Sequence, residues 1–196
     1  MDFLGFEKLL YHPERLQLLR EGRPQFPLHL TISLGNYCNH KCLWCTAYEF
    51  QQTKANQIDK DELLNFLKSA VNRGTRAVGY VGNGEPTAYT EFGSLSDEVR
   101  ALGLQQGIFT NGYLIDRFKD HLLNNFTYVR VSLDAGSTEI HSSMHDVNDQ
   151  FDKIIGNIAD LVEAKNGDFP TIGIQYAVHH RNLNDLKKSA ILAKKI

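Results

Sequence analysis

Short apolar runs alternate along the chain with longer stretches in which apolar residues recur at helical spacing. The short runs occupy residues 30–34, 77–81, 107–110, 128–133 and 172–178, a length typical of buried strands. In the stretch after the first run, apolar residues recur three and four positions apart, at Leu63, Phe66, Leu67, Ala70 and Val71. The same periodicity predicts helices at about residues 95–102, 115–123 and 151–162, and a last helix beyond residue 184.

Capping residues stand where these helices should begin and end. Asp59 can cap the first helix and Gly74 can end it in the left-handed conformation, while Gly103 can end the second. Asn184 or Asp185 can cap the last one. Strands that alternate with amphipathic helices predict right-handed βαβ units around a parallel sheet. We therefore predict an α/β fold with about five units, arranged as part of a parallel (β/α) barrel.

The two ends of the chain differ from this regular pattern. Within residues 1–27, Phe6, Leu9 and Leu16 could share one helical face, but Pro13 should interrupt such a helix. We expect a lead-in over residues 1–27 and one core domain over residues 28–196. Because the sequence stops at Ile196 within helical sequence, we expect the C-terminal part of the barrel to be missing. An additional domain or a partner chain would then complete it.

Composition narrows the classes of function. The 196 residues include 21 Lys and Arg against 23 Asp and Glu, and the pI of about 6.4 argues against a nucleic-acid partner. No apolar stretch approaches the roughly 18 residues that span a bilayer. The N-terminus does not resemble a secretory signal, so we expect a cytoplasmic protein with no membrane partner. The three cysteines all lie within eight residues, which favours a metal site over a disulfide framework.

The cysteines form a C-x3-C-x2-C motif, Cys38, Cys42 and Cys45, directly after the first predicted strand. Thiolates hold iron–sulfur clusters, and a [4Fe–4S] cluster normally takes four of them. Three ligands would leave one iron open for chemistry. Two alternatives stay open: chance spacing, and a zinc site that uses His40 inside the loop, although that spacing matches no common zinc finger.

The motif after the first strand resembles the radical SAM superfamily, from about residue 30 to the end. The resemblance implies a full or partial (β/α)6 barrel, a [4Fe–4S] cluster on the three cysteines, and S-adenosylmethionine (SAM). The segment GNGEP at residues 82–86 is similar to the family's GGEP segment, with Asn83 in place of a glycine. That similarity implies contacts of Asn83, Gly84, Glu85 and Pro86 with the amino group of SAM.

Two further segments resemble the family's SAM contacts. In VSLDA, residues 131–135, Ser132 and Asp134 are implied to bind the ribose and the methionine carboxylate, although Asp134 could instead form an Asx turn. Many relatives place an Arg about ten residues later to bind the carboxylate. This chain has none there, which leaves Ser143 and His145 as candidates.

The remaining candidates lie around the pocket that the resemblance predicts. Asn111 of the TNG segment at residues 110–112 corresponds to the pocket floor, or to a simple Asn-Gly turn. Trp44 is implied to stack near the adenine, although core packing would explain it equally well. Val178 and Asn182 are possible contacts on the adenine side.

The resemblance also implies an activity. The reduced cluster would cleave SAM to a 5′-deoxyadenosyl radical, which abstracts hydrogen from an unidentified substrate: a peptide, a sugar or a small metabolite. Flavodoxin or ferredoxin would supply the electron. The nearest subgroups modify peptides, sugars and cofactors, often with a C-terminal auxiliary-cluster domain, but no cysteine follows Cys45. The alternative is a non-catalytic iron–sulfur or SAM-binding subunit that needs a partner to complete the barrel.

Overall fold

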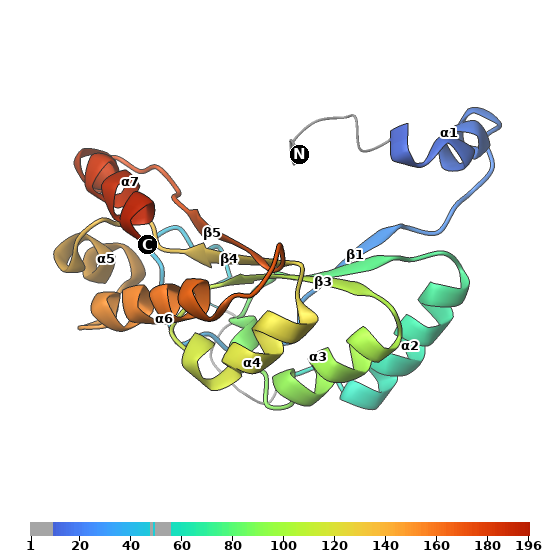
Figure 1. The fold of residues 1–196 in the computed structure, drawn as a ribbon, viewed down its shortest axis with the longest axis horizontal. Helices are drawn as coiled ribbons and strands as arrows, with labels where there is room; N and C mark the ends of the chain where they lie inside the picture. Colours follow the sequence, from blue (N-terminus) through green and yellow to red (C-terminus); the bar gives the residue numbers. More distant parts are fainter. Residues whose placement is uncertain (1–9, 48, 50–55) are drawn as a thin grey trace.

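Five parallel strands form one sheet, in the order of the chain (Figure 1). The computed structural model describes residues 10–47, 49 and 56–196. The strands are β1 (His29–Ile32), β2 (Ala77–Tyr80), β3 (Gln105–Thr110), β4 (Tyr128–Ser132) and β5 (Thr171–Gln175). In the described part of the chain β1 and β5 are the edges and the sheet is not closed. The predicted α/β fold with a partial parallel barrel is confirmed, with strand ends that differ from prediction by up to three residues.

The helices that connect consecutive strands lie on one side of the sheet (Figure 1). These are α2 (Lys60–Asn72), α3 (Phe92–Ala101), α4 (Ile115–Asn125) and α6 (Phe151–Ala164). When all connections between neighbouring parallel strands have the same handedness, their helices lie on the same side of the sheet. Three shorter helices, η3 (Pro86–Ala88), α5 (Thr138–His145) and η4 (Leu183–Asp185), precede α3, α6 and α7 (Leu186–Lys195).

Most of the predicted helix ends are confirmed. The Asp59 carboxylate accepts the Glu62 N–H at 2.9 Å, and Gly74 follows α2 with φ of +100°. Asp185 stands before α7, but its carboxylate accepts the Gly136 N–H at 2.6 Å and so binds the loop before α5. Helix α5 itself is a finding of the structure that the apolar pattern did not predict.

The lead-in contains α1 (Pro13–Arg20), which Pro13 begins rather than interrupts. Proline suits the first helical turn because its missing N–H would have no partner there. No residue of α1 is buried, and the Arg15 guanidinium ties the helix to the carbonyls of Phe26 and Gly74. Phe6 and Leu9 lie outside the described residues.

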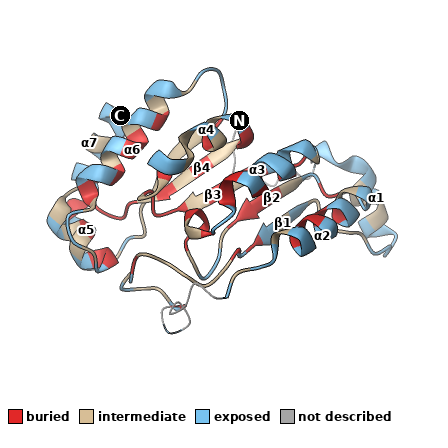
Figure 2. Cartoon of the chain, turned by 90° about the horizontal axis from the view of Figure 1, so that it is seen from below, coloured by how far each residue is buried: buried red, intermediate tan, exposed pale blue. Residues whose placement is uncertain are grey.

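The core lies between the sheet and the helices, whose buried sides (red) face the strands in Figure 2. Its fully buried members include Leu67, Val78, Tyr80, Leu95, Val99, Ile108, Leu122, Val129, Val131, Ile154 and Leu161. Phe66, which the periodicity placed on the buried face of α2, is instead 49% exposed. Among the described residues, no helix combines the length and apolar character that crossing a membrane requires.

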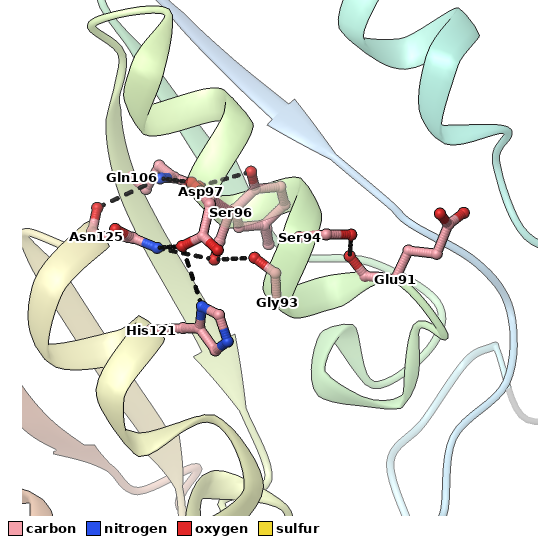
Figure 3. A network of polar contacts seen from close by, with 9 residues as sticks. Glu91, Gly93, Ser94, Ser96, Asp97, Gln106, His121 and Asn125 are labelled. Atoms are coloured by element: carbon pink, nitrogen blue, oxygen red, sulfur yellow. Dashed lines mark hydrogen bonds and ion pairs between the residues drawn. The ribbon is translucent and has the colours of Figure 1, made fainter.

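A buried polar network joins α3 and α4 to the start of β3 (Figure 3). The Tyr80 hydroxyl donates to Gln106 Oε1 at 2.8 Å, and the Gln106 amide donates to the Ser96 carbonyl at 2.8 Å. The Asn125 amide donates to Asp97 at 2.6 Å. The network therefore connects the side chain of β2's last residue and the start of β3 to the two helices that cover them.

Candidate functional site

A cavity of about 360 Å³ lies at the carboxyl ends of the strands, under the loop that follows β1. Its lining includes nearly every residue that the sequence singled out: Cys38, Cys42, Trp44, Cys45, Asn83, Gly84, Glu85, Asn111, Ser132 and Asp134. Pro86 does not line it and is buried at the start of η3. His40, which we weighed as a zinc ligand, and His145, a candidate for the carboxylate of SAM, also line it. Sequence reasoning missed other lining residues, among them Phe109 of β3 and Gln175 of β5, for which the place at a strand end is the available signal.

The cysteine loop is held by backbone hydrogen bonds to the end of α5. The N–H groups of Lys41 and Leu43 donate to the carbonyls of His145 and Met144, both at 2.9 Å. Within the loop, the Cys45 N–H donates to the Cys42 carbonyl at 2.9 Å. The loop therefore has a defined shape although it contains no helix or strand among its described residues.

Two of the thiols are strongly shielded from water. Burial, followed by the Glu85 carboxylate, raises the pKa of Cys38 to about 12. Burial, followed by Cys38, raises the pKa of Cys42 to about 12 as well. Both are therefore protonated thiols until a metal displaces the protons. With Cys45 they place three sulfur ligands on one cavity, a donor set that fits a [4Fe–4S] cluster with one open iron.

The Glu85 carboxylate joins two segments at the cavity wall. Oε1 accepts the N–H and hydroxyl of Thr87, at 3.0 and 2.6 Å, and the hydroxyl of Thr110 at 2.6 Å. Oε2 accepts the Asn111 N–H at 2.8 Å. Burial raises the pKa of Glu85, and these hydrogen bonds oppose the shift. Glu85 thus connects the GNGEP and TNG segments, in addition to lining the cavity.

Gly84 is required by a close approach of two backbones. A Cβ atom there would lie 2.5 Å from the Gly35 carbonyl oxygen and 2.6 Å from that of Tyr37. The next residue, Glu85, donates its N–H to the same Tyr37 carbonyl at 2.9 Å. The GNGEP segment therefore packs directly under the start of the cysteine loop.

Asn111 connects the TNG segment to the same loop. Its amide donates to Asn39 Oδ1 at 2.8 Å, and its side-chain oxygen accepts the Tyr113 N–H at 3.1 Å. The structure thus contains the Asn-Gly turn that we considered, with Gly112 at φ of +82°, and also places Asn111 on the cavity. Both interpretations of Asn111 fit this geometry.

Ser132 and Asp134 occupy different environments after β4. Ser132 is half-buried and lines the cavity. Asp134 has φ of +54° and is buried, and its carboxylate accepts the Ala177 N–H in a very short hydrogen bond. Burial raises the pKa of Asp134 to about 6, although this hydrogen bond opposes the shift. Asp134 therefore connects the loops after β4 and β5, and it has less freedom than Ser132 to bind a ligand.

Three histidines gather behind the cysteine loop. His145 Nδ1 lies 3.1 Å from Cys42 Sγ, and its ring is edge-on to Trp44 at 5.4 Å. His40 and His141 pack against it, the latter stacked at 4.5 Å. Burial is the first cause that lowers their pKa values, to about 4 for His40 and His141 and about 3 for His145. All three rings are therefore neutral.

Of the remaining candidates, Ser143, Val178 and Asn182 lie away from the cavity lining. Ser143 is exposed on α5 and Val178 is 62% exposed. The Asn182 amide donates to the carbonyls of Asp134 and Ala177, both at 2.9 Å, and so holds the loop after β5. His145 lines the cavity, but both of its ring nitrogens already have neighbours.

Known proteins resemble this chain in sequence and in fold. The probable GTP 3′,8-cyclase of Metallosphaera sedula is 28% identical over 172 residues, 86% of this chain and 52% of that protein. The molybdenum cofactor biosynthesis protein moc-5 of Caenorhabditis elegans is also 28% identical over 172 residues, 85% of this chain and 28% of that protein. The chain therefore spans about half, or less, of the length of these relatives.

A solved structure shares the fold over almost the whole chain. Streptococcus suis SuiB bound to S-adenosylmethionine superposes with a TM-score of 0.73, over 97% of this chain and 43% of that one, at 20% identity. The family described as the radical SAM superfamily matches residues 32–193, which include the cysteine loop and every residue that lines the cavity. The chain belongs to the radical SAM superfamily, whose members use a [4Fe–4S] cluster and SAM.

Proposed function

We propose that residues 28–196 are the catalytic core of a radical SAM enzyme, with residues 1–27 as a lead-in. The observation that supports this most directly is that Cys38, Cys42 and Cys45 line one cavity at the carboxyl ends of parallel strands. Active sites of such sheets collect there. When bound and reduced, the cluster supplies the electron that cleaves SAM to a 5′-deoxyadenosyl radical, which takes hydrogen from the substrate.

The residues of the chain would bind and orient SAM. Ser132 and the backbone of Asn83 and Gly84, which line the cavity, offer polar contacts for the ribose and the amino group, and Trp44 offers an aromatic face. Glu85 would contact SAM together with these residues, while its carboxylate keeps the hydrogen bonds that connect the segments of the cavity wall. Three further residues would both shape the cavity and make the SAM contacts that the family resemblance implies: Asp134, Asn111 and the buried Pro86.

The substrate class that we propose is a peptide, a sugar or a small metabolite. The family contains named GTP cyclases, and SuiB has been solved with its precursor peptide SuiA. Flavodoxin or ferredoxin would supply the electron, in the cytoplasm, where thiols stay reduced. An additional domain or partner chain would cover the open edge of the sheet.

Anaerobic reconstitution with iron and sulfide tests the proposal. We expect about four irons per chain, and loss of the cluster in Cys38→Ala, Cys42→Ala and Cys45→Ala. The variant Ser132→Ala should keep its iron but bind SAM more weakly. Dithionite should then release 5′-deoxyadenosine from SAM. A protein that binds the cluster and SAM but never forms 5′-deoxyadenosine would instead support the non-catalytic subunit, and unchanged iron in the cysteine variants would contradict both.

A further inference from the structure

The hydrogen bonds of His145 determine which of its ring nitrogens holds the proton. Nε2 lies 3.1 Å from the Leu133 carbonyl oxygen, and a carbonyl can only accept. Asp134 Oδ2, a second acceptor, lies 3.5 Å from the same nitrogen. Nε2 therefore holds the hydrogen of the neutral ring. Nδ1 has a bare lone pair, and this lone pair faces Cys42 Sγ at 3.1 Å.

The same argument applies to His40. Its Nε2 lies 2.9 Å from Gln150 Oε1, an acceptor, so this nitrogen donates. The bare Nδ1 of His40 lies 3.4 Å from the bare Nδ1 of His145. The Cys42 thiol can donate its hydrogen to His145 Nδ1, and the Nδ1 lone pair of His40 lies beside this contact. A cation placed among the three atoms would be attracted by both nitrogen lone pairs and by the thiolate that remains when Cys42 loses its proton.

The distances allow a small tetrahedral site. His145 Nδ1 lies 3.4 Å from His40 Nδ1 and 3.1 Å from Cys42 Sγ, and one ligand atom of each of the three residues lies within 4.8 Å of the others. In a zinc site with bonds of about 2.0–2.3 Å, neighbouring ligand atoms are about 3.3–3.6 Å apart. Both histidines are at most 1% exposed. In each ring the Nε2–H donates to an oxygen, which is how metal-binding histidines are usually held.

We propose that the cluster-free chain binds one divalent ion of the zinc type through His40 Nδ1, Cys42 Sγ and His145 Nδ1. Water would fill the fourth position, and the Cys42 thiol would release its proton to solvent on binding. Because the iron–sulfur cluster also needs Cys42, the ion and the cluster exclude each other. The ion would thus hold the cysteine loop in a form without a cluster. The binding of the ion goes beyond the proposed function and does not depend on it, whereas the exclusion rests on the proposed cluster.

Cobalt(II) is the probe, because it occupies such sites and its spectrum reports both thiolate bonding and tetrahedral geometry. Cluster-free protein, reduced and anaerobic, should bind one cobalt with a sulfur-to-cobalt charge-transfer band and strong visible bands. Zinc should displace it. The variants His40→Ala and His145→Ala should lose these bands, and Gln150→Ala should bind about 10- to 100-fold more weakly.

Two sets of variants separate this site from the cluster. Cys38→Ala should lose the iron–sulfur cluster but keep the cobalt bands, whereas His145→Ala should lose the bands but reconstitute the same iron content as the unmodified chain. Full iron uptake also shows that the variant is folded. His141→Phe is the matched control, because it keeps a ring stacked on His145 and should keep the cobalt bands.

Competition tests the exclusion. Zinc added before reconstitution should reduce iron uptake by the unmodified chain, but should not reduce it in His40→Ala. If Cys38→Ala abolishes the cobalt bands, or if both histidine variants keep them, the ion binds elsewhere and the proposal is wrong. If the unmodified chain takes up no iron while the cobalt results hold, only the proposed function fails.

Discussion

The variant Glu85→Gln tests whether the hydrogen bonds of the Glu85 carboxylate stabilise the cavity wall. Each carboxylate oxygen accepts one backbone N–H, that of Thr87 on Oε1 and that of Asn111 on Oε2. A glutamine has only one oxygen, so either orientation of its amide turns an NH2 group toward one of these donors. We therefore expect Glu85→Gln to leave one buried N–H unsatisfied.

The magnitude follows from the cost of such a group. An unsatisfied buried donor costs about 1–3 kcal/mol, so Glu85→Gln should reduce the free energy of unfolding by about that amount. Glu85→Ala leaves both N–H groups without the carboxylate and should cost about 2–6 kcal/mol. The hydroxyls of Thr87 and Thr110 add less because they can rotate toward other acceptors.

Urea unfolding of the cluster-free protein, followed by circular dichroism, measures the effect. With a slope of about 2 kcal/mol per molar urea, the midpoint of Glu85→Gln should fall by roughly 0.5–1.5 M. Glu163→Gln, an exposed change on α6, is the control and should shift stability by less than about 0.5 kcal/mol. If Glu85→Gln moves the midpoint no more than this control, the carboxylate is not needed for the fold.

Three further predictions use the same preparation. Gly84→Ala forces a Cβ against the Gly35 and Tyr37 carbonyls, so its reconstituted iron content should fall, whereas Gly156→Ala, which has open space, should match the unmodified chain. Asn125→Ala removes hydrogen bonds to Ser96 and Asp97 and should cost about 1–3 kcal/mol in the urea assay; equal midpoints would contradict the role of the network. Burial opposes ionisation of Asp185, but its hydrogen bonds hold the pKa below the usual value, so its carboxylate stabilises the fold above about pH 4 and loses that effect as pH falls through the lowered pKa. Asp185→Asn should therefore destabilise the protein at pH 7 and much less near pH 3, and an equal loss at both values would contradict this.

Periodicity was enough to predict the sheet and its covering helices, because their buried faces consist mainly of apolar side chains. Helix α5 escaped prediction for a physical reason. Its buried side chains include His141 and His145, which a hydrophobic pattern counts as polar. Their burial depends on other parts of the chain, since His40 and Phe151 pack against the same rings.

The place of the site was predictable, and the bonds within it were not. Segments such as GNGEP and TNG end neighbouring parallel strands, so the sheet must bring them together. Nothing in either segment shows that the Glu85 carboxylate is held by Thr110 and Asn111, about 25 residues away. The family resemblance implies only that Glu85 contacts a ligand, whereas the structure shows that the same carboxylate also hydrogen-bonds to another segment of the chain.

The pair His40 and His145 shows most clearly where spacing along the sequence fails. In a sequence, zinc sites are identified by short separations between their ligands, and no common spacing of that kind pairs His40 with another histidine. The structure supplies one from 105 residues away, because the backbone of Lys41 and Leu43 hydrogen-bonds to the end of α5. These same bonds shape the loop that presents Cys42. The contacts that position Cys42 on the cavity therefore also place two imidazole nitrogens near it, and any change that loosens α5 should disturb both proposed metal sites together.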